Sequence, residues 1–155
     1  MKTIPLTQGL FALVDDEDFE YLNQWKWYAA RQWNTYYAFR QDYSSGKPKT
    51  IRMHREVMGE DPRNIDHRDG DGLNNQKCNL RYCTHSQNHQ NRKHHRNTSS
   101  IYKGVSLTYN KWRAQIMNQG KVAYIGLFYT EEEAALAYDT KAKELFGEFA
   151  RPNFS

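Results

Sequence analysis

The stretch IDHRDGDGLNNQKCNLRYCTHSQN, residues 65–88, is too polar to build a hydrophobic core of its own. Its pattern predicts a brief strand at residues 65–67 and a loop over residues 68–77, where Gly and Asn favour turns. A second strand is expected at residues 79–84, because apolar and polar residues alternate there. A serine suits the N-cap of a polar helix predicted over residues 86–95. The order is therefore strand, loop, strand, helix.

The composition of the whole chain predicts several small aromatic cores. The 155 residues are enough for one ordinary domain or two small ones. Leu, Ile, Val and Phe together number only 27, which is close to the composition of disordered chains. The 11 Tyr and 4 Trp argue against disorder, since each aromatic ring buries a large area.

The charge of the chain is unevenly distributed. The formal net charge is +4, yet no Asp or Glu occurs in the 59 residues from Gly72 to Thr130, which carry nine Lys or Arg and four His. A basic stretch of this length is typical of proteins that bind a phosphate backbone. The alternative is a solvated basic face.

Residues 1–53 predict a small β-rich subdomain. Two short strands flank a Gln-Gly turn, and residues 15–24 begin with acids that suit the start of a short helix. Residues 35–43 and 49–57 are expected to form a hairpin. An aromatic platform for nucleic-acid bases is the alternative to a packed aromatic core. The core residues expected here are Trp25, Trp27, Trp33, Tyr36 and Tyr37.

Residues 101–155 predict three strands and a helix, after a polar linker at residues 96–100. Thr130 and Glu133 form a capping box at the start of the helix, and Gly147 ends it. The strands are expected at residues 102–107, 111–117 and 121–129. The helical stripe expected to face them is Ala134, Tyr138, Ala142 and Leu145.

The middle of these three strands has two different faces. Trp112, Ala114 and Ile116 are expected to contact the helix, because side chains alternate across a strand. A face that carries Lys, Arg and Gln without a carboxylate can enter the major groove of DNA. The outward residues are Lys111, Arg113 and Gln115.

The polar stretch carries groups that suit phosphodiester hydrolysis. Such a reaction needs an activated water and charge stabilisation on the phosphate. His67 can act as a general base, and Asp66 and Asn88 offer the oxygen atoms that a hard divalent cation prefers. The neighbouring polar residues are interpreted as turn residues: Asp69, Asp71, Asn74 and Asn75.

The central segment, residues 54–95, resembles the HNH endonucleases of phages and homing introns. The matching residues are Asp66-His67, Asn79 twelve positions later and Asn88 nine positions further. The resemblance implies a ββα-metal fold with His67 as general base. Asp66 and Asn88 would ligate one Mg²⁺ or Mn²⁺ per active site, and Asn79 would brace the loop and orient His67.

The last segment resembles the AP2/ERF DNA-binding domain, through the strings YKGV, KWRAQI, YIGLF, TEEEAALAYD and GEFARPNF. The two together resemble phage-type HNH–AP2 endonucleases. The basic residues Arg92, Lys93 and Arg96 precede this domain and are expected along the phosphate backbone. The resemblance and the strand pattern imply DNA contacts at Lys103, Ser106, Tyr109, Lys111, Arg113, Gln115 and Tyr124.

We therefore expect an α+β protein that cuts double-stranded DNA, nicking as a monomer or breaking both strands as a homodimer. A non-catalytic DNA-binding regulator is the alternative, and the aromatic N-terminal segment leaves an RNA-binding module open. No apolar run approaches about 18 residues, so we expect a cytoplasmic protein of a phage or bacterium. Zinc is not expected, because Cys78 and Cys83 lack a second pair. His54 is either a strand-end residue packed under the loop or a substrate contact.

Overall fold

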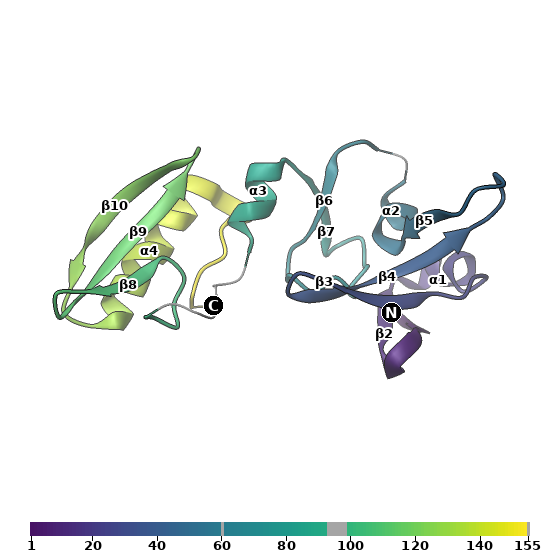
Figure 1. Ribbon diagram of the computed structural model, residues 1–155, viewed down its shortest axis with the longest axis horizontal. Helices are drawn as coiled ribbons and strands as arrows, with labels where there is room; N and C mark the ends of the chain where they lie inside the picture. Colours follow the sequence, from purple (N-terminus) through teal and green to yellow (C-terminus); the bar gives the residue numbers. More distant parts are fainter. Residues whose placement is uncertain (60, 93–98, 155) are drawn as a thin grey trace. The chain divides into compact units, whose positions relative to one another are not determined.

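The computed structural model describes residues 1–59, 61–92 and 99–154 of an α+β protein (Figure 1). The chain forms two compact units, Met1–Thr84 and His85–Ser155, and each is described by itself. The four-part division at residues 1–53, 54–95, 96–100 and 101–155 stays a prediction. In the described ranges, no helix is long and apolar enough to cross a membrane.

The first unit begins with a short antiparallel pair of strands and a helix. β1 (Lys2–Pro5) pairs with β2 (Phe11–Val14) around the 3-10 turn η1 (Thr7–Gly9). α1 (Asp16–Leu22) follows, and the acids in its first turn interact favourably with the positive end of the helix dipole. Both predictions for this segment are confirmed.

The second sheet of the first unit has the order β3-β4-β5, with β3 (Tyr28–Gln32), β4 (Thr35–Asp42) and β5 (Lys49–Arg52). The predicted hairpin is confirmed as β4–β5, but its second strand is shorter than residues 49–57. The helix α2 (Met53–Met58) takes over at Met53. Met53 and His54 are both buried. In a strand with one exposed face, two adjacent side chains would point to opposite faces and only one would be buried.

The core of the first unit is small and partly aromatic. It contains Trp27, whose indole Nε1 donates to the Leu22 carbonyl at 2.7 Å, and Trp25 packs at its edge. The prediction that Trp33 fills this core is wrong. Trp33 is 83% exposed in the turn between β3 and β4, where a side chain cannot reach the core. The other members of the core are Ile4, Ala12, Val14, Leu22, Ala38 and Met53.

The hairpin β6 (Asn64–His67) and β7 (Leu80–Cys83) completes the first unit. Both strands were predicted to within two residues. Their connecting loop is bonded to β2, because the Leu13 N–H donates to the Leu73 carbonyl and the Asn75 N–H donates to the Leu13 carbonyl, each at 2.8 Å. The loop also lies against β4, where a Cβ at Gly72 would overlap Tyr37. The loop is thus part of the packed unit.

The second unit is one three-stranded sheet covered by one long helix. α3 (His85–Gln90) comes first and ends well before residue 95, and residues 93–98 lie outside the described part of the chain. The sheet has the order β10-β9-β8, with β8 starting only at residue 105 because residues 102–104 form a turn. The strands are β8 (Val105–Thr108), β9 (Lys111–Asn118) and β10 (Lys121–Phe128).

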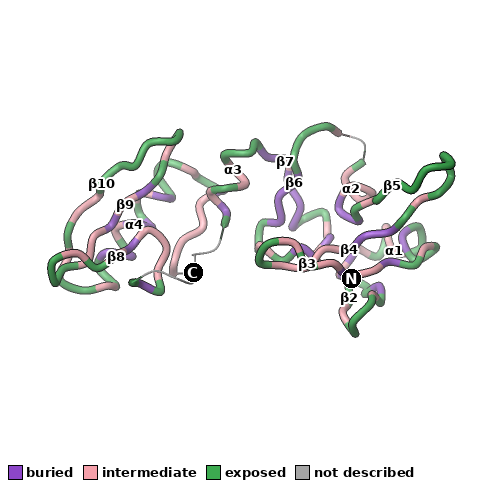
Figure 2. The backbone as a smooth tube through the Cα atoms, in the orientation of Figure 1, coloured by how far each residue is buried: buried purple, intermediate pink, exposed green. Residues whose placement is uncertain are grey.

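Helix α4 (Glu131–Phe146) packs on the sheet through small residues, and η2 (Gly147–Phe149) follows it. The predicted capping box is present, since the Thr130 hydroxyl accepts from the Glu133 N–H at 3.1 Å. Figure 2 shows the buried positions along α4 and β9. Leu145 does not belong to the buried stripe, because the stripe advances by four residues from Ala142 to Phe146.

Candidate functional site

His67 lies in a cluster of rings that three elements of the first unit bring together. It ends β6, and its ring centroid is 5.2 Å from that of His54 on α2 and 5.6 Å from that of Tyr37 on β4. Tyr37 and His54 also contact each other at 5.9 Å. His54 is therefore a buried helix residue beside His67, and its placement at a strand end was wrong.

Burial keeps both histidines of this cluster neutral. It lowers the pKa of His67 below its ordinary value of 6.5, while Asn75 and the Asp69 carboxylate act in the opposite direction. Burial also lowers the pKa of His54, to about 3, with the charges of His67, Arg52 and Arg55 adding to the effect. A neutral imidazole can accept a proton from water, as a general base must.

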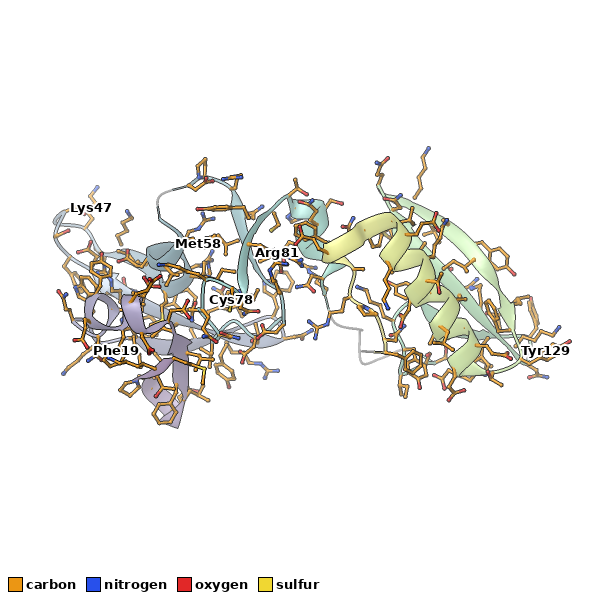
Figure 3. All side chains as sticks on the ribbon, turned by 180° about the vertical axis from the view of Figure 1, so that it is seen from behind. Phe19, Lys47, Met58, Cys78, Arg81 and Tyr129 are labelled. Atoms are coloured by element: carbon orange, nitrogen blue, oxygen red, sulfur yellow. The ribbon has the colours of Figure 1, made fainter. Side chains whose placement is uncertain are left out.

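Asp66, the other motif residue of β6, is held by a buried arginine. The Arg81 guanidinium contacts Oδ2 of Asp66 through Nε at 2.9 Å and Nη2 at 2.7 Å, and the two residues are direct partners across the hairpin (Figure 3). Asp66 and His67 point to opposite faces of β6, since side chains alternate along a strand. The carboxylate and the imidazole are thus separately positioned.

Asn79 ties the two ends of the loop together. Its amide Nδ2 donates to Asp69 Oδ1 at 3.0 Å and to the Asn74 carbonyl at 2.9 Å, and its Oδ1 accepts from the Asp69 N–H at 3.1 Å. Asp69 also accepts from the Asp71 N–H and from Asn74 Nδ2, both at 2.8 Å. These bonds occupy Asp69 within the turn.

Asn75 was interpreted as a turn residue, and its burial was missed. Only 1% of Asn75 is exposed, and its side chain raises the pKa of His67. The two consecutive asparagines of GLNN were the available signal for this burial. A loop asparagine that packs inward must hydrogen-bond to the surrounding chain. Asn75 thus belongs to the surroundings of the His67 ring.

The fourth motif residue belongs to the other compact unit. Asn88 is half-buried on α3 in the second unit, whereas Asp66, His67 and Asn79 lie in the first. Within the described ranges, no group of three or more His, Cys, Asp or Glu residues could hold a metal ion. Cys78 is exposed and Cys83 is buried, and both are free thiols.

The outer face of the second unit's sheet gathers the residues implied for DNA contact. Strand register places Ser106 opposite Arg113 and Tyr124 opposite Gln115, on the side away from α4. Tyr109, in the turn between β8 and β9, is 97% exposed. Lys111 shares the outer face and holds its Nζ 4.7 Å from the centroid of the Tyr129 ring.

The polar groups of this face are poorly satisfied by the protein itself. Arg113 Nε and Ser106 Oγ are buried without a hydrogen-bond partner among the described residues. The same side of the sheet carries the exposed side chains of Met117, Tyr124 and Leu127. A face that combines apolar rings, free donors and no carboxylate suits a polyanion with flat aromatic bases.

The remaining basic residues implied for DNA contact are placed differently. Lys103 donates through Nζ to the Gln90 carbonyl inside the second unit, and burial lowers its pKa to about 8, with Arg151 adding to the shift. Arg92 is exposed. Lys93 and Arg96 lie outside the described residues.

Two kinds of known protein are similar to this chain, and no family model matches it. An uncharacterized HNH endonuclease of Acanthamoeba polyphaga mimivirus is 35% identical over 154 residues, covering 94% of this chain and 76% of that protein. Dehydration-responsive element-binding protein 2D of Arabidopsis thaliana is 47% identical over 60 residues, which cover 37% of this chain and 29% of that protein.

A second plant relative gives the same result. Dehydration-responsive element-binding protein 2A of Oryza sativa subsp. indica is 42% identical over 62 residues, 38% of this chain and 23% of that protein. This chain thus spans less than a third of each of these two plant proteins. The likeness to the viral protein extends over nearly the whole chain, and this chain therefore belongs to the HNH endonucleases, with an additional segment of the AP2/ERF type.

Proposed function

We propose that this endonuclease hydrolyses phosphodiester bonds of duplex DNA, with His67 as general base and one divalent metal ion on Asp66 and Asn88. The observation that carries the proposal is the buried, neutral imidazole of His67 next to the fixed carboxylate of Asp66. These are the two groups that a hydrolytic nuclease needs beside its phosphate.

In this proposal His67 removes a proton from the attacking water. The water attacks phosphorus in line with the leaving 3′ oxygen, so the products carry 5′-phosphate and 3′-hydroxyl ends. The rings of His54 and Tyr37 restrict the imidazole, because a packed ring keeps its orientation between turnovers. A base held in this way is useful only if it is uncharged, which burial ensures.

The donor atoms of the two proposed ligands are of the kind that a hard divalent cation prefers. Asp66 and Asn88 offer oxygen atoms, and Mg²⁺ and Mn²⁺ accept one or two protein oxygens beside water and phosphate. Arg81 orients the Asp66 carboxylate in the way that partners of metal ligands commonly do. When bound, the ion would stabilise the negative charge that develops on the phosphate and the leaving oxygen.

The sheet of the second unit is proposed to hold the duplex. Arg113 and Gln115 on β9 have side chains that can hydrogen-bond to base edges in a major groove. The exposed tyrosines Tyr109 and Tyr124 add contact area to sugars and phosphates. With one active site per chain, a monomer would nick one strand and a homodimer would cut both.

Incubation of supercoiled plasmid with Mg²⁺ or Mn²⁺ tests this proposal. We expect nicked or linear plasmid from the wild type, and a loss of about 10²–10⁴-fold in His67→Ala. His67→Ala should still bind duplex DNA with the wild-type affinity. A wild-type protein that binds DNA but cuts with neither metal would instead be a DNA-binding regulator. Equal loss of binding and cutting in His67→Ala would make His67 a structural residue.

A further inference from the structure

The first unit contains a hollow of about 500 Å³ beside the edge strand β5 and the helix α2. This volume lies in the range of small-molecule sites, about 300–1,000 Å³, and exceeds what one phosphate group fills. Among the described residues, β5 pairs only with β4, so the N–H and C=O groups on its outer edge are unpaired. The residues around the hollow are Gln32, Phe39, Lys49–Arg52, Arg55, Glu56, Gly59, Asp61 and Pro62.

The charges that line the hollow leave it electropositive. Arg52 lies on the same face of β5 as Phe39 does on β4, Lys49 comes from the opposite face at the outer edge of β5, and Arg55 comes from α2. Two acids also line it, and both are already neutralised by other arginines. Glu56 is paired with Arg40 at 3.4 Å, and Asp61 is paired with Arg63 at 2.8 Å.

The hollow also has apolar lining residues. Phe39, Ile51 and Pro62 line it, and the Arg52 guanidinium carbon lies 5.9 Å from the centroid of the Phe39 ring. Cations at the rim match phosphates, and apolar lining residues match the carbon atoms of deoxyribose. This combination fits the sugar–phosphate backbone of a nucleic acid strand.

The hollow and the proposed catalytic residue belong to the same unit and are connected through α2. Arg55 follows His54 directly on α2, and the His54 ring is 5.2 Å from that of His67. At the end of α2, the Met58 carbonyl accepts from the Tyr82 hydroxyl of β7 at 2.7 Å (Figure 3). Consecutive nucleotides of one strand advance by about 3.4 Å along the helix axis, so a strand that contacts both α2 and the hollow would be held a few nucleotides from the cut.

We infer that this hollow binds the backbone of the DNA strand near its scissile phosphate, with Lys49 and Arg52 as the phosphate contacts. The inference rests on the proposed nuclease function and gives the N-terminal segment a role in it. Arg55 is a rim residue, because its Nη1 already donates to the Asp61 carbonyl. The hollow would fix the cut strand against His67, while the sheet of the second unit holds the duplex.

The first test measures the salt dependence of DNA binding in a His67→Ala background, which leaves the DNA uncut. Each lost phosphate contact lowers the slope of log K against log salt by about 0.9. We therefore expect a decrease of about 0.9 for Arg52→Gln and about 1.8 for Arg52→Gln with Lys49→Gln. The control is Lys26→Gln, an exposed lysine away from the hollow. Because Lys49 and Arg52 are exposed, melting temperatures should stay within about 3 °C.

The second test places a neutral methylphosphonate at single positions on either side of the mapped cut in a synthetic duplex. One or two positions should weaken binding by the protein with Lys49 and Arg52 intact, and the same positions should have no effect on the double variant. Unchanged salt slopes, or equal sensitivity of both proteins at every position, would overturn the inference. If the inference about the hollow fails but the wild type still cuts plasmid, the nuclease proposal is unaffected. A wild type that never cuts removes the nuclease proposal, whatever the slopes show.

Discussion

The hairpin around His67 and the contact between α4 and β9 in the second unit are filled by different kinds of residue. Beside its small core, the first unit buries Arg40, His54, Asp66, Asn75 and Arg81. The second unit fills its interface between α4 and β9 with alanines and a few larger apolar residues. The second unit also buries Asn91, Ser100 and Asp139, which are not part of these apolar clusters. Burying a polar group costs free energy unless it is paired, so the hairpin around His67 depends on pairing, whereas the contact between α4 and β9 depends on close packing.

The largest expected effect is at the buried ion pair of the first unit. Arg81→Met keeps most of the side-chain volume but leaves the Asp66 carboxylate buried without its arginine. We expect the free energy of unfolding to fall by about 3–5 kcal/mol, measured by urea denaturation. Arg63→Met breaks the more exposed pair with Asp61 and should change the free energy of unfolding far less, because exposed ion pairs contribute little. Similar losses in both variants would show that the first unit does not depend on the pairing of its buried polar groups.

Close packing in the second unit is tested at two glycines with nearly the same backbone. Gly104 and Gly120 have φ of 77° and 76°, but a Cβ would overlap the Tyr138 ring only at Gly104. Gly104→Ala should lower the free energy of unfolding by about 3 kcal/mol, from strain and overpacking together. Gly120→Ala should lower it by about 1 kcal/mol, from strain alone. Thermal unfolding measures the difference in stability between the two variants. Overpacking against Tyr138 predicts such a difference, whereas backbone strain alone predicts equal losses.

The buried histidine predicts a pH dependence that belongs to the first unit. The pKa of His54 is about 3 in the folded protein and near 6.5 when unfolded, so the unfolded chain binds the extra proton between these values. Stability should therefore fall as pH drops from about 6.5 to about 3, by up to 1.4 kcal/mol per pH unit from this residue. His54→Gln should flatten that fall in urea titrations at each pH. Parallel curves for the two proteins would show that His54 is protonated while folded.

The smallest effect is expected at the start of α4. Thr130→Ala removes the hydroxyl that accepts from the Glu133 N–H, and should cost about 1 kcal/mol. Thr140→Ala makes the same chemical change at an exposed position inside α4, where alanine is the better helix former. Thermal unfolding should thus show opposite signs for the two variants. If both variants lost stability, the Thr130 cap would not be what stabilises the start of α4.

Much of the second unit followed from local patterns in the sequence. The three strands, their turns and the capping box at Thr130 were each predicted from residues close together in the chain, and the structure contains them. Asp66 and His67 were likewise placed on a short strand. Such features depend on spacing and turn chemistry, which a sequence displays directly.

The surroundings of His67 were decided only by tertiary structure. His54 was expected at a strand end, Asn75 in a turn and Trp33 in the core, and each lies elsewhere. His54 and His67 are thirteen positions apart in the chain, and their rings meet only because folding brings α2 and the end of β6 together in one unit. Contacts between distant segments leave no periodicity in the chain. The sequence alone therefore determined that Asp66 and His67 lie on one short strand, whereas folding determined what surrounds the His67 ring and hence its charge.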